Sequence, residues 1–193
     1  MSTGGAVPRA PDAITLYAIA GRRGPKQREI IEALGPVLAP TLAKWGITPG
    51  LEAALFLGQC ATESDGFSTT TEYASGRAYE GRRDLGNTQP GDGVKYKGHA
   101  LIQVTGRDNH RRCGLALGID AENHPELLAQ PEHALEASCW FWVTNRIGPW
   151  ARKGDVLAVS RAVNLGNPTK QRTPNGWTER QSYTRKARLS LGV

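Results

Sequence analysis

Apolar residues recur at helical spacing along most of the chain, and this pattern restricts the fold more than any other feature of the sequence. Over residues 25–47 the apolar side chains lie three and four positions apart, which is the spacing of one buried helix face. They are Ile30, Ile31, Leu34, Val37, Leu38, Leu42 and Trp45. Because proline disrupts a helix interior, we expect two short helices divided around Gly35-Pro36.

Later segments carry the same signal. Residues 48–66 predict a helix with Thr48 as N-cap and Pro49 in the first turn, ending at Gly66. Another helix is expected to begin at Pro131, with a core face of Ala134, Ala137, Ser138, Phe141 and Trp142. Residues 155–166 and 177–193 predict the last two helices.

Residues 68–98 interrupt this helical pattern. They are rich in Gly, Thr, Asn, Asp and Pro, and they predict a long irregular loop with room for a short strand or hairpin. Loops of this length are usually functional or disordered. The expected fold class is therefore mainly α, with a loop-rich region packed against the helices.

The 193 residues suit one domain, and the sequence holds no internal repeat or domain linker. We expect a flexible tail over residues 1–12 and a single domain over residues 13–193. The N-terminus lacks the basic-then-apolar pattern of a secretory signal, and no segment has the length and hydropathy of a membrane span. We therefore expect synthesis in the cytoplasm and no stable insertion into a membrane.

Charge is distributed unevenly. From Thr144 to the end there are ten Lys/Arg and two Asp/Glu, whereas the first 143 residues have fourteen basic and sixteen acidic residues. A basic end on a near-neutral body suits an anionic polymer: nucleic acid, anionic lipid or bacterial wall. A merely soluble surface explains the charge equally well. The basic residues do not alternate with an aromatic platform, which argues against nucleic acid.

The cysteines and histidines do not indicate a metal site. Cys60, Cys113 and Cys139 are widely spaced, and the four His lack metal-ligand spacing. Buried free thiols are expected, although one disulfide stays open.

Glu63 is a lone carboxylate at the end of an apolar helical segment. At about 100° per residue it lies within about 20° of Phe56, with Leu55 and Gln59 on the same stripe. Apolar surroundings and the negative end of the helix dipole both disfavour a charged carboxylate. A carboxylic acid that keeps its proton near neutral pH can protonate a glycosidic oxygen. A salt-bridged or snorkelling glutamate is the structural alternative.

A second carboxylate follows nine positions later. Inverting glycosidases need a second Asp/Glu across the sugar to activate water, and Glu72 could face Glu63 across a cleft. Glu80 is the local competitor for this role, although Arg82 and Arg83 beside it favour a paired or solvated position equally.

Five sequence blocks together resemble the family 19 glycoside hydrolases. In order they are FLGQCATESDGF…E, YKGHALIQVTGRDNH, NHPELLAQPEHALEASCWFW, VSRAVNLG and ERQSYTRKARLSLG. The resemblance runs from about residue 27 to the end and is closest to the bacteriophage endolysins and prophage lysozymes of the family. It implies a mainly α, lysozyme-like α+β fold with a substrate cleft between helical lobes. It also implies hydrolysis of a β-1,4 bond beside N-acetylated amino sugars.

The resemblance also implies roles for individual residues. Glu63 matches the general acid of the family's HES block, and Glu72 matches the second acid of the phage branch. Gln103 matches a sugar-binding glutamine, and Thr105 matches a hydroxyl residue that helps to hold the nucleophilic water.

Five more side chains are candidates for contact with the substrate. Asn109 and Asn164 match asparagines of the family, and Arg180 matches an arginine of the last helix that supports the second acid. Tyr96 and Tyr73 flank the irregular loop, where each could either stack on a sugar face or pin the loop down.

Three departures from the family pattern concern the surroundings of the acids. Thr62 stands where the family usually has His, His99-Ala100 replace the Arg-Gly of its GRG block, and Leu165 replaces a Gly. None removes a carboxylate, so they bear on efficiency and substrate more than on reaction type.

The function predicted from the sequence is that of a monomeric, muramidase-type endolysin. It would cleave bacterial peptidoglycan by inversion, without cofactor or metal, and would reach the wall only after the membrane is permeabilised. Chitin is the alternative substrate, and a non-catalytic wall-binding module is the alternative function.

Overall fold

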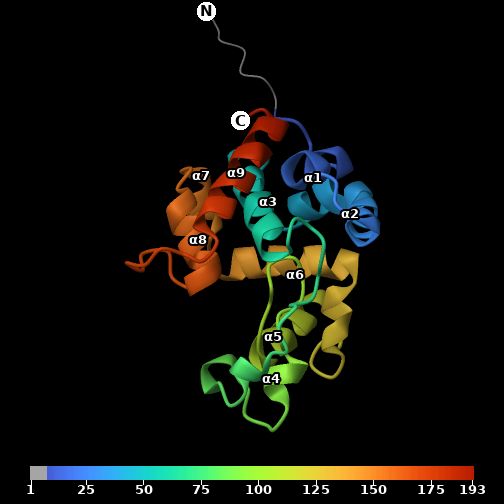
Figure 1. The fold of residues 1–193 in the computed structure, drawn as a ribbon, viewed down its shortest axis with the longest axis vertical. Helices are drawn as coiled ribbons and strands as arrows, with labels where there is room; N and C mark the ends of the chain where they lie inside the picture. Colours follow the sequence, from blue (N-terminus) through green and yellow to red (C-terminus); the bar gives the residue numbers. More distant parts are fainter. Residues whose placement is uncertain (1–7) are drawn as a thin grey trace, which may run out of the picture.

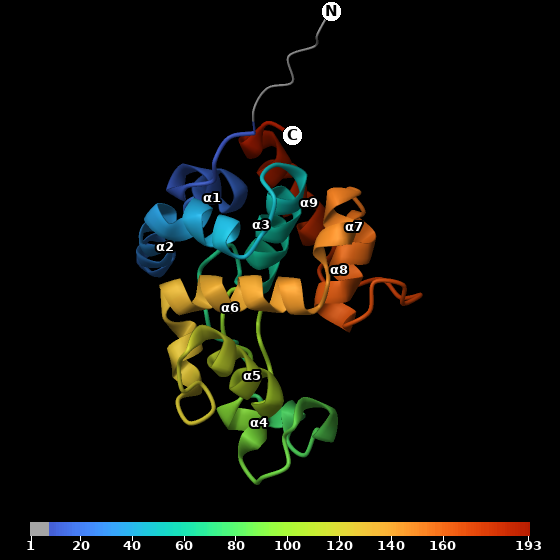
Figure 2. The same ribbon diagram turned by 180° about the vertical axis from the view of Figure 1, so that it is seen from behind.

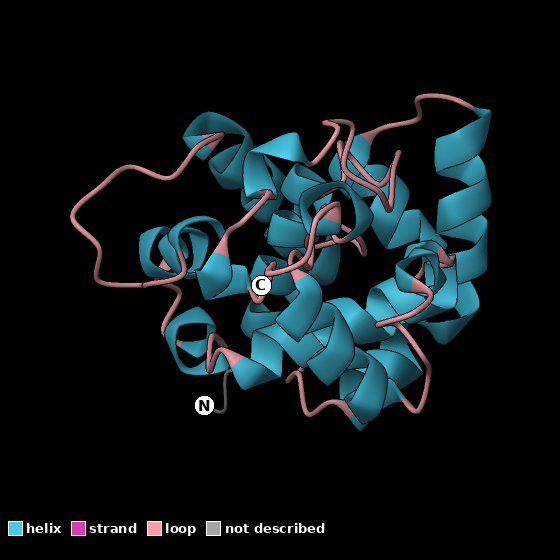
Figure 3. Cartoon of the chain, turned by 90° about the horizontal axis from the view of Figure 1, so that it is seen from below, coloured by secondary structure: helices cyan, strands magenta, loops and turns pink. Residues whose placement is uncertain are grey.

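The structure is a computed structural model and describes residues 8–193. In this part of the chain, helices make up nearly all the regular structure (Figure 1). The α-helices there are α1 (Ala13–Ala20), α2 (Pro25–Lys44), α3 (Leu51–Glu63), α4 (Asp92–Lys95), α5 (Arg107–Leu117), α6 (Pro131–Thr144), α7 (Gly148–Arg152), α8 (Val156–Leu165) and α9 (Trp177–Leu191). Three 3₁₀ helices, η1 (Arg77–Tyr79), η2 (Arg83–Leu85) and η3 (Pro125–Ala129), lie in the connections. Figure 3 shows these helices joined by loops. The mainly α fold class is confirmed.

The apolar pattern of residues 25–47 forms one helix, so the expected division around Gly35-Pro36 is wrong. Pro36 and Pro40 both lie inside α2, where each leaves a backbone carbonyl without its helical donor. The buried face nevertheless continues through both positions. It consists of Ile30, Ile31, Leu34, Leu38 and Leu42. Burying this continuous face offsets the lost hydrogen bonds.

Helix α3 begins at Leu51 with Gly50 as its N-cap, so the cap expected at Thr48 is wrong. The Thr48 hydroxyl instead donates to Glu52 Oε2 at 2.6 Å. Glu52 is buried, and its carboxylate also accepts from Trp142 Nε1 at 3.1 Å and from Arg152 Nη1 at 2.9 Å. These bonds tie the start of α3 to α6 and α7.

Helices α3 and α9 pack closely because α3 has a glycine at the contact. A Cβ atom at Gly58 would lie 2.8 Å from Thr184 Cα and 2.9 Å from Thr184 N. Only a residue without a side chain permits this approach. The contact brings the last turn of α3 beside the first turns of α9.

Helix α6 runs across the middle of the molecule and separates two lobes (Figures 1 and 2). One lobe holds α1–α3 and α7–α9, and the other holds α4, α5 and the irregular region predicted over residues 68–98. Within this region η1, η2 and α4 are short, and isolated β-bridges join Thr71 to His99 and His99 to Val104. The irregular region is therefore confirmed, with bridges in place of a hairpin.

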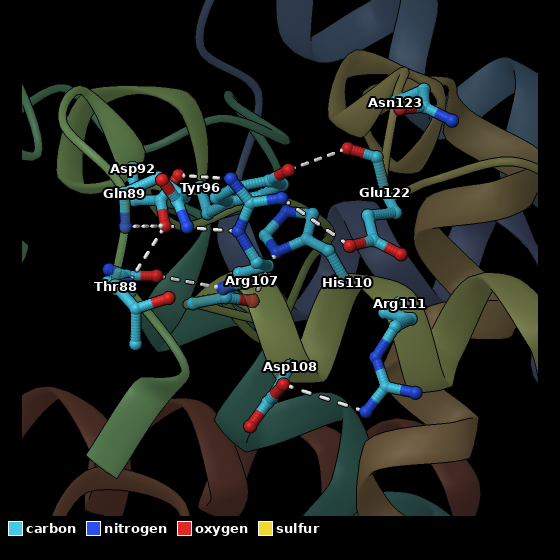
Figure 4. A network of polar contacts seen from close by, with 12 residues as sticks. Thr88, Gln89, Asp92, Tyr96, Arg107, Asp108, His110, Arg111, Glu122 and Asn123 are labelled. Carbon is cyan, nitrogen blue, oxygen red and sulfur yellow. Dashed lines mark hydrogen bonds and ion pairs between the residues drawn. The ribbon is translucent and has the colours of Figure 1, made fainter. Parts of the chain in front are cut away.

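A buried ion pair holds the smaller lobe together (Figure 4). The Asp92 carboxylate accepts from Arg107 Nη2 at 2.5 Å and Nε at 3.0 Å, and from the backbone N–H groups of Thr88 and Gln89. The Arg107 guanidinium holds the pKa of Asp92 below its usual value, although burial acts against this. Tyr96 lies under the same guanidinium, 4.8 Å from ring centre to Cζ.

Tyr96 is fully buried and donates its hydroxyl to the Glu122 carbonyl at 2.8 Å. The structure therefore places Tyr96 in the core of the smaller lobe, where it pins the loop, and not at a surface where it could stack on a sugar. An aromatic residue in a polar loop looks the same in the sequence whether it faces solvent or the core.

Residues 8–12, which were expected to belong to a flexible tail over residues 1–12, pack against the body; residues 1–7 lie outside the described part. Arg9 N donates to the Leu191 carbonyl at 3.1 Å, and Asp12 caps α1 through Thr15 N at 2.9 Å.

The three cysteines are buried and unpaired. None of the helices in residues 8–193 has the length and hydropathy needed to cross a bilayer.

Candidate active site

Glu63 and Glu72 line one cavity of about 360 Å³ at the end of α3. Glu63 is the last residue of α3, and Glu72 lies in the chain segment that returns past it. The cavity is lined by Thr62, Glu63, Asp65, Thr69, Glu72, Tyr73, Ala74, Tyr79, Gln103 and Thr105. Five candidates named from the sequence therefore meet here: both carboxylates, Gln103, Thr105 and Tyr73.

Glu63 is anchored through one of its two carboxylate oxygens. Arg180 Nη2 donates to Oε1, whereas Oε2 has no hydrogen-bond partner within residues 8–193. The Glu63 side chain is 18% exposed. One oxygen is thus fixed, and the other remains available to a ligand in the cavity.

Arg180 supports the first carboxylate and not the second, so the predicted support of Glu72 is wrong. It is 2% exposed, and it also donates to Gln59 Oε1 at 2.5 Å and to the Asn175 carbonyl at 2.8 Å. Buried behind Glu63, Arg180 does not line the cavity, so its assignment as a substrate-binding residue is also wrong. Sequence order cannot reveal which of two acids a residue of α9 reaches.

Glu72 is held through both carboxylate oxygens. The Tyr79 hydroxyl donates to Oε1 at 3.0 Å, and Gly98 N donates to Oε2 at 2.9 Å. Burial, followed by the charge and hydrogen bond of Glu72, raises the pKa of Tyr79 to about 12. Tyr79 therefore keeps its proton at any physiological pH, and the Glu72 carboxylate serves as an acceptor.

Gln103 and Thr105 are positioned by a strained turn. Ala100 and Gln103 both have positive φ, 72° and 63°. Such backbone strain in non-glycine residues is typical of functional sites. Gln103 Oε1 is buried without a hydrogen-bond partner in the described structure, and the Thr105 hydroxyl donates to the Gln103 carbonyl at 3.0 Å. An unpaired amide oxygen at a cavity wall is ready to accept from a ligand hydroxyl or amide.

Neither predicted asparagine lines the cavity. Asn109 Nδ2 donates to the Thr105 carbonyl at 2.8 Å, and Asn164 Oδ1 accepts from Asn175 N at 2.8 Å. Asn109 therefore supports Thr105, and Asn164 supports the loop whose Asn175 carbonyl binds Arg180. In the structure both act behind the residues that face a ligand.

Glu80 points away from this site. Its carboxylate accepts from Gly91 N at 2.6 Å and Gly93 N at 2.8 Å, and it does not line the cavity. Of the two candidates for the second acid, only Glu72 shares a cavity with Glu63.

The cavity residues that were not predicted from the sequence include Asp65 and Tyr79. Asp65 has a positive φ of 49°, and its carboxylate accepts from Arg23 and from the Tyr73 hydroxyl, the latter at 3.2 Å. Tyr73 itself is 71% exposed at the rim. No local sequence pattern distinguishes Asp65 or Tyr79 from other polar loop residues.

A larger cavity of about 760 Å³ lies along α9 and holds no carboxylate. It is lined by Val156, Thr178, Gln181, Ser182, Thr184, Arg185, Arg188, Leu189 and Val193. Within residues 8–193 no three His, Cys, Asp or Glu side chains converge in the manner of a metal site. Paired carboxylates are the groups suited to acid–base chemistry, and they occur together in the smaller cavity.

Comparison with known proteins identifies similar sequences and folds. The sequence model of the family described as chitinase class I matches residues 10–158. A glycosyl hydrolase family 19 domain-containing protein of Haemophilus influenzae is 26% identical over 168 residues, which cover 70% of this chain and 82% of that protein. An inactive chitinase-like protein of Hevea brasiliensis is 27% identical over 169 residues, which cover 81% of this chain and 50% of that protein.

The structure of a family GH19, class IV chitinase from Zea mays has the same fold. It superposes with a TM-score of 0.70 at 19% identity, covering 94% of this chain and 92% of the maize chain. The plant relatives are longer: the chain spans 49% of an endochitinase of Pisum sativum and 50% of the Hevea protein. The lysozyme-like fold expected from the resemblance is confirmed.

Proposed function

Because the chain belongs to glycosyl hydrolase family 19, the chitinase class I family, it is a glycoside hydrolase, and we propose that its substrate is bacterial peptidoglycan. The proposed activity is that of a muramidase-type endolysin of bacteriophage origin, cleaving β-1,4 bonds beside N-acetylated amino sugars by inversion. The observation that carries the proposal is the shared cavity of Glu63 and Glu72, with Gln103 and Thr105 in its wall.

The hydrogen bonds support different roles for the two carboxylates. Glu72 accepts a hydrogen bond at each oxygen, so its carboxylate is held in a fixed position that suits a general base. Glu63 Oε2 has no protein partner in the described structure and can carry a proton toward a bound sugar. Arg180 then stabilises the Glu63 carboxylate that remains after the proton has left.

The proposed reaction is a single displacement. Glu63 gives its proton to the glycosidic oxygen as the bond from that oxygen to the anomeric carbon breaks. A water held near Thr105 attacks the anomeric carbon from the opposite face and loses a proton to Glu72. The products are one sugar with a new anomeric hydroxyl of inverted configuration and one sugar with a free alcohol. Both carboxyl groups then exchange protons with solvent before the next turnover.

Charge favours peptidoglycan over chitin as the substrate. The protein carries a formal net charge of +6, and the excess lies in its last 50 residues. Chitin is a neutral polymer, whereas the bacterial wall carries carboxylates and phosphates that attract a basic protein. Chitin remains the alternative substrate because the same carboxylates and amides would serve it.

We further propose that the protein acts as a monomer after synthesis in the host cytoplasm. It would reach the wall when a separate agent opens the membrane. Neither stable membrane insertion nor a nucleic-acid partner is part of this proposal.

Clearing of Gram-negative cells with a permeabilised outer membrane tests the proposal. Wild type should clear the cells, and Glu63→Gln should lose about 10²–10⁴-fold in rate because an amide cannot donate the proton. Glu72→Gln should lose a similar factor. Proton NMR of the reducing ends released early in the reaction should show the inverted anomer.

Glu80→Gln is the matched control, because it makes the same change in the same loop outside the cavity. If the Glu63→Gln variant keeps full activity and has the circular dichroism spectrum of wild type, the assignment of Glu63 as the acid is overturned. If wild type cleaves only chitin oligomers, the substrate is chitin. If it binds walls without cleaving either polymer, the protein is a non-catalytic module.

A further inference from the structure

A small basic cavity lies next to the carboxylate cavity. It has a volume of about 80 Å³, enough for roughly two to three waters or one small anionic group. It is lined by Tyr17, Arg22, Arg23, Gly24, Gln27 and Arg28, from the end of α1 to the start of α2. The three arginines belong to the sequence GRRGPKQR, residues 21–28, which has four basic residues and no acid. We call these three side chains the arginine pocket.

The arginine pocket is joined directly to the carboxylate cavity. Arg23 Nη1 donates to the carboxylate of Asp65, which lines the carboxylate cavity, and to the Asp65 carbonyl at 2.9 Å. Arg23 Nη2 donates to the Tyr183 hydroxyl of α9 at 2.7 Å. Arg23 is therefore fixed between the two cavities, so the two cavities are neighbours.

The other two arginines of the pocket, Arg22 and Arg28, have no acidic partner within residues 8–193. Both side chains are exposed. Arg22 is held with its Cζ 4.3 Å from the centre of the Tyr17 ring. Glu32, an acid of α2, accepts from the Tyr17 hydroxyl at 2.9 Å and does not line the pocket.

The start of α2 adds to the positive potential. Gly24 is its N-cap and offers no side-chain hydrogen bond, so the first amide groups of a 20-residue helix are left without a side-chain cap. The positive end of the helix dipole favours an anion in the same place as the arginines.

We propose that the arginine pocket binds a carboxylate of the peptide stems of peptidoglycan while the glycan strand occupies the carboxylate cavity. This inference rests on the proposed function. A peptide stem presents free carboxylates beside the glycan, and arginine guanidinium groups recognise carboxylates through paired N–H donors. Chitin has no such group, so the arginine pocket distinguishes the two polymers.

The kinetic test compares two substrates. The double variant Arg22→Gln/Arg28→Gln should raise KM on peptidoglycan freed of attached phosphate polymers about tenfold, with kcat nearly unchanged. On chitin hexamer its kinetics should equal those of wild type. Arg146→Gln/Lys153→Gln is the matched control, since it removes the same charge from exposed residues near α7. An equal loss in both double variants would reduce the effect to general attraction and overturn the proposal.

A binding measurement separates this inference from the proposed function. Glu63→Gln is titrated calorimetrically with a disaccharide carrying a peptide stem, and with the same disaccharide after amidase has removed the stem. The stem should tighten binding about tenfold, and Arg22→Gln/Arg28→Gln in that background should abolish the difference. If wild type fails to cleave peptidoglycan but this difference is found, the proposed function fails and the arginine pocket stands. If wild type cleaves peptidoglycan and the stem adds nothing, the arginine pocket fails alone.

Discussion

Tyr79 makes the clearest contribution of a single residue outside the two acids. Its hydroxyl is one of the two donors that hold Glu72, and its raised pKa keeps the proton in place. Tyr79 is a positioning residue in this arrangement, because it acts through Glu72.

Tyr79→Phe removes this donor and leaves the ring. With one hydrogen bond fewer, the Glu72 carboxylate is held less firmly in its position in the cavity. We expect kcat to fall about tenfold with KM nearly unchanged, because a hydrogen bond to a charged group contributes about 1.5–3 kcal/mol. Tyr73→Phe is the control, because it removes a hydroxyl from the same cavity without a bond to Glu63 or Glu72. An unchanged kcat in Tyr79→Phe would contradict the role.

The residue Ala100 carries strain that the family pattern avoids. It has a φ of 72° at the position where the family usually has glycine. A left-handed conformation costs a non-glycine residue about 1–2 kcal/mol. Glycine relieves this strain but adds roughly 0.5–1 kcal/mol of chain entropy in the unfolded state.

Ala100→Gly should therefore stabilise the protein by up to about 1 kcal/mol. Urea denaturation followed by circular dichroism measures the change, with the same m-value in both proteins. Ala116→Gly, in the last turn of α5, is the control and should destabilise instead. A lower midpoint for Ala100→Gly would show that the turn is not strained.

At the level of elements, helices were predictable where the signal is local and periodic. The helices beginning at Pro131 and near residues 155 and 177 form as expected. Of the predicted core face, Ala134, Ala137, Ser138 and Trp142 are buried, and Phe141 is partly buried. The boundaries of α2 and α3 were wrong because they depend on distant contacts. Burial against other helices carries α2 through two prolines, and Glu52 recruits Thr48 away from capping.

For the candidate site, too, local patterns were predictable and contacts between segments were not. The five sequence blocks identified Glu63, Glu72, Gln103 and Thr105, which share one cavity. They did not identify the hydrogen-bond partners of each acid, which come from other segments of the chain. Arg180 reaches Glu63 from 117 positions away. No spacing in the sequence encodes such a contact, so its direction was predicted wrongly.

Two buried histidines link the elements of the smaller lobe. His99 Nδ1 and His110 Nε2 share a hydrogen bond at 2.9 Å, and His110 Nδ1 lies 2.9 Å from the Gly106 carbonyl. Burial lowers the pKa of His110 to about 4 and, with Lys97 nearby, also lowers the pKa of His99. Both rings are therefore neutral in the folded protein at pH 7.

Acid should destabilise this lobe. Below about pH 6.5 the unfolded chain binds protons at these histidines that the folded chain excludes, so the free energy of unfolding falls as pH decreases from about 6.5 to about 4. His110 alone accounts for about 3 kcal/mol of this loss. Urea titrations at pH 6.5 and 4.5 should show the loss in wild type and in the exposed-residue control His124→Gln. In His110→Asn the free energy of unfolding should differ less between the two pH values. An equal difference in all three proteins would contradict this.

On the scale of the whole molecule, two lobes meet at the carboxylate cavity, and positive charge collects on one of them. The larger lobe holds the arginine pocket and α9, whose exposed arginines and lysine include Arg185, Lys186 and Arg188. The smaller lobe instead uses its buried charges internally, as the Asp92–Arg107 pair shows.

Binding to the bacterial wall should therefore depend on salt concentration more strongly than the rate of glycosidic bond hydrolysis does. Raising NaCl from about 0.1 to about 0.5 M shortens the screening length, so binding of Glu63→Gln to purified peptidoglycan should weaken several-fold. Hydrolysis of chitin hexamer by wild type serves as the reference for a neutral substrate and should change little. Salt-independent binding to peptidoglycan would exclude electrostatic attraction.

The bond between Arg180 and Glu63 also sets an order of events during synthesis. Helix α3 leaves the ribosome long before α9 does, so during most of translation Glu63 has neither its arginine nor the close packing of Thr184 on Gly58. A nascent chain therefore holds both carboxylates before it holds the arginine that anchors Glu63. The Arg180–Glu63 pair forms only after the last helix has been made and has docked on α3.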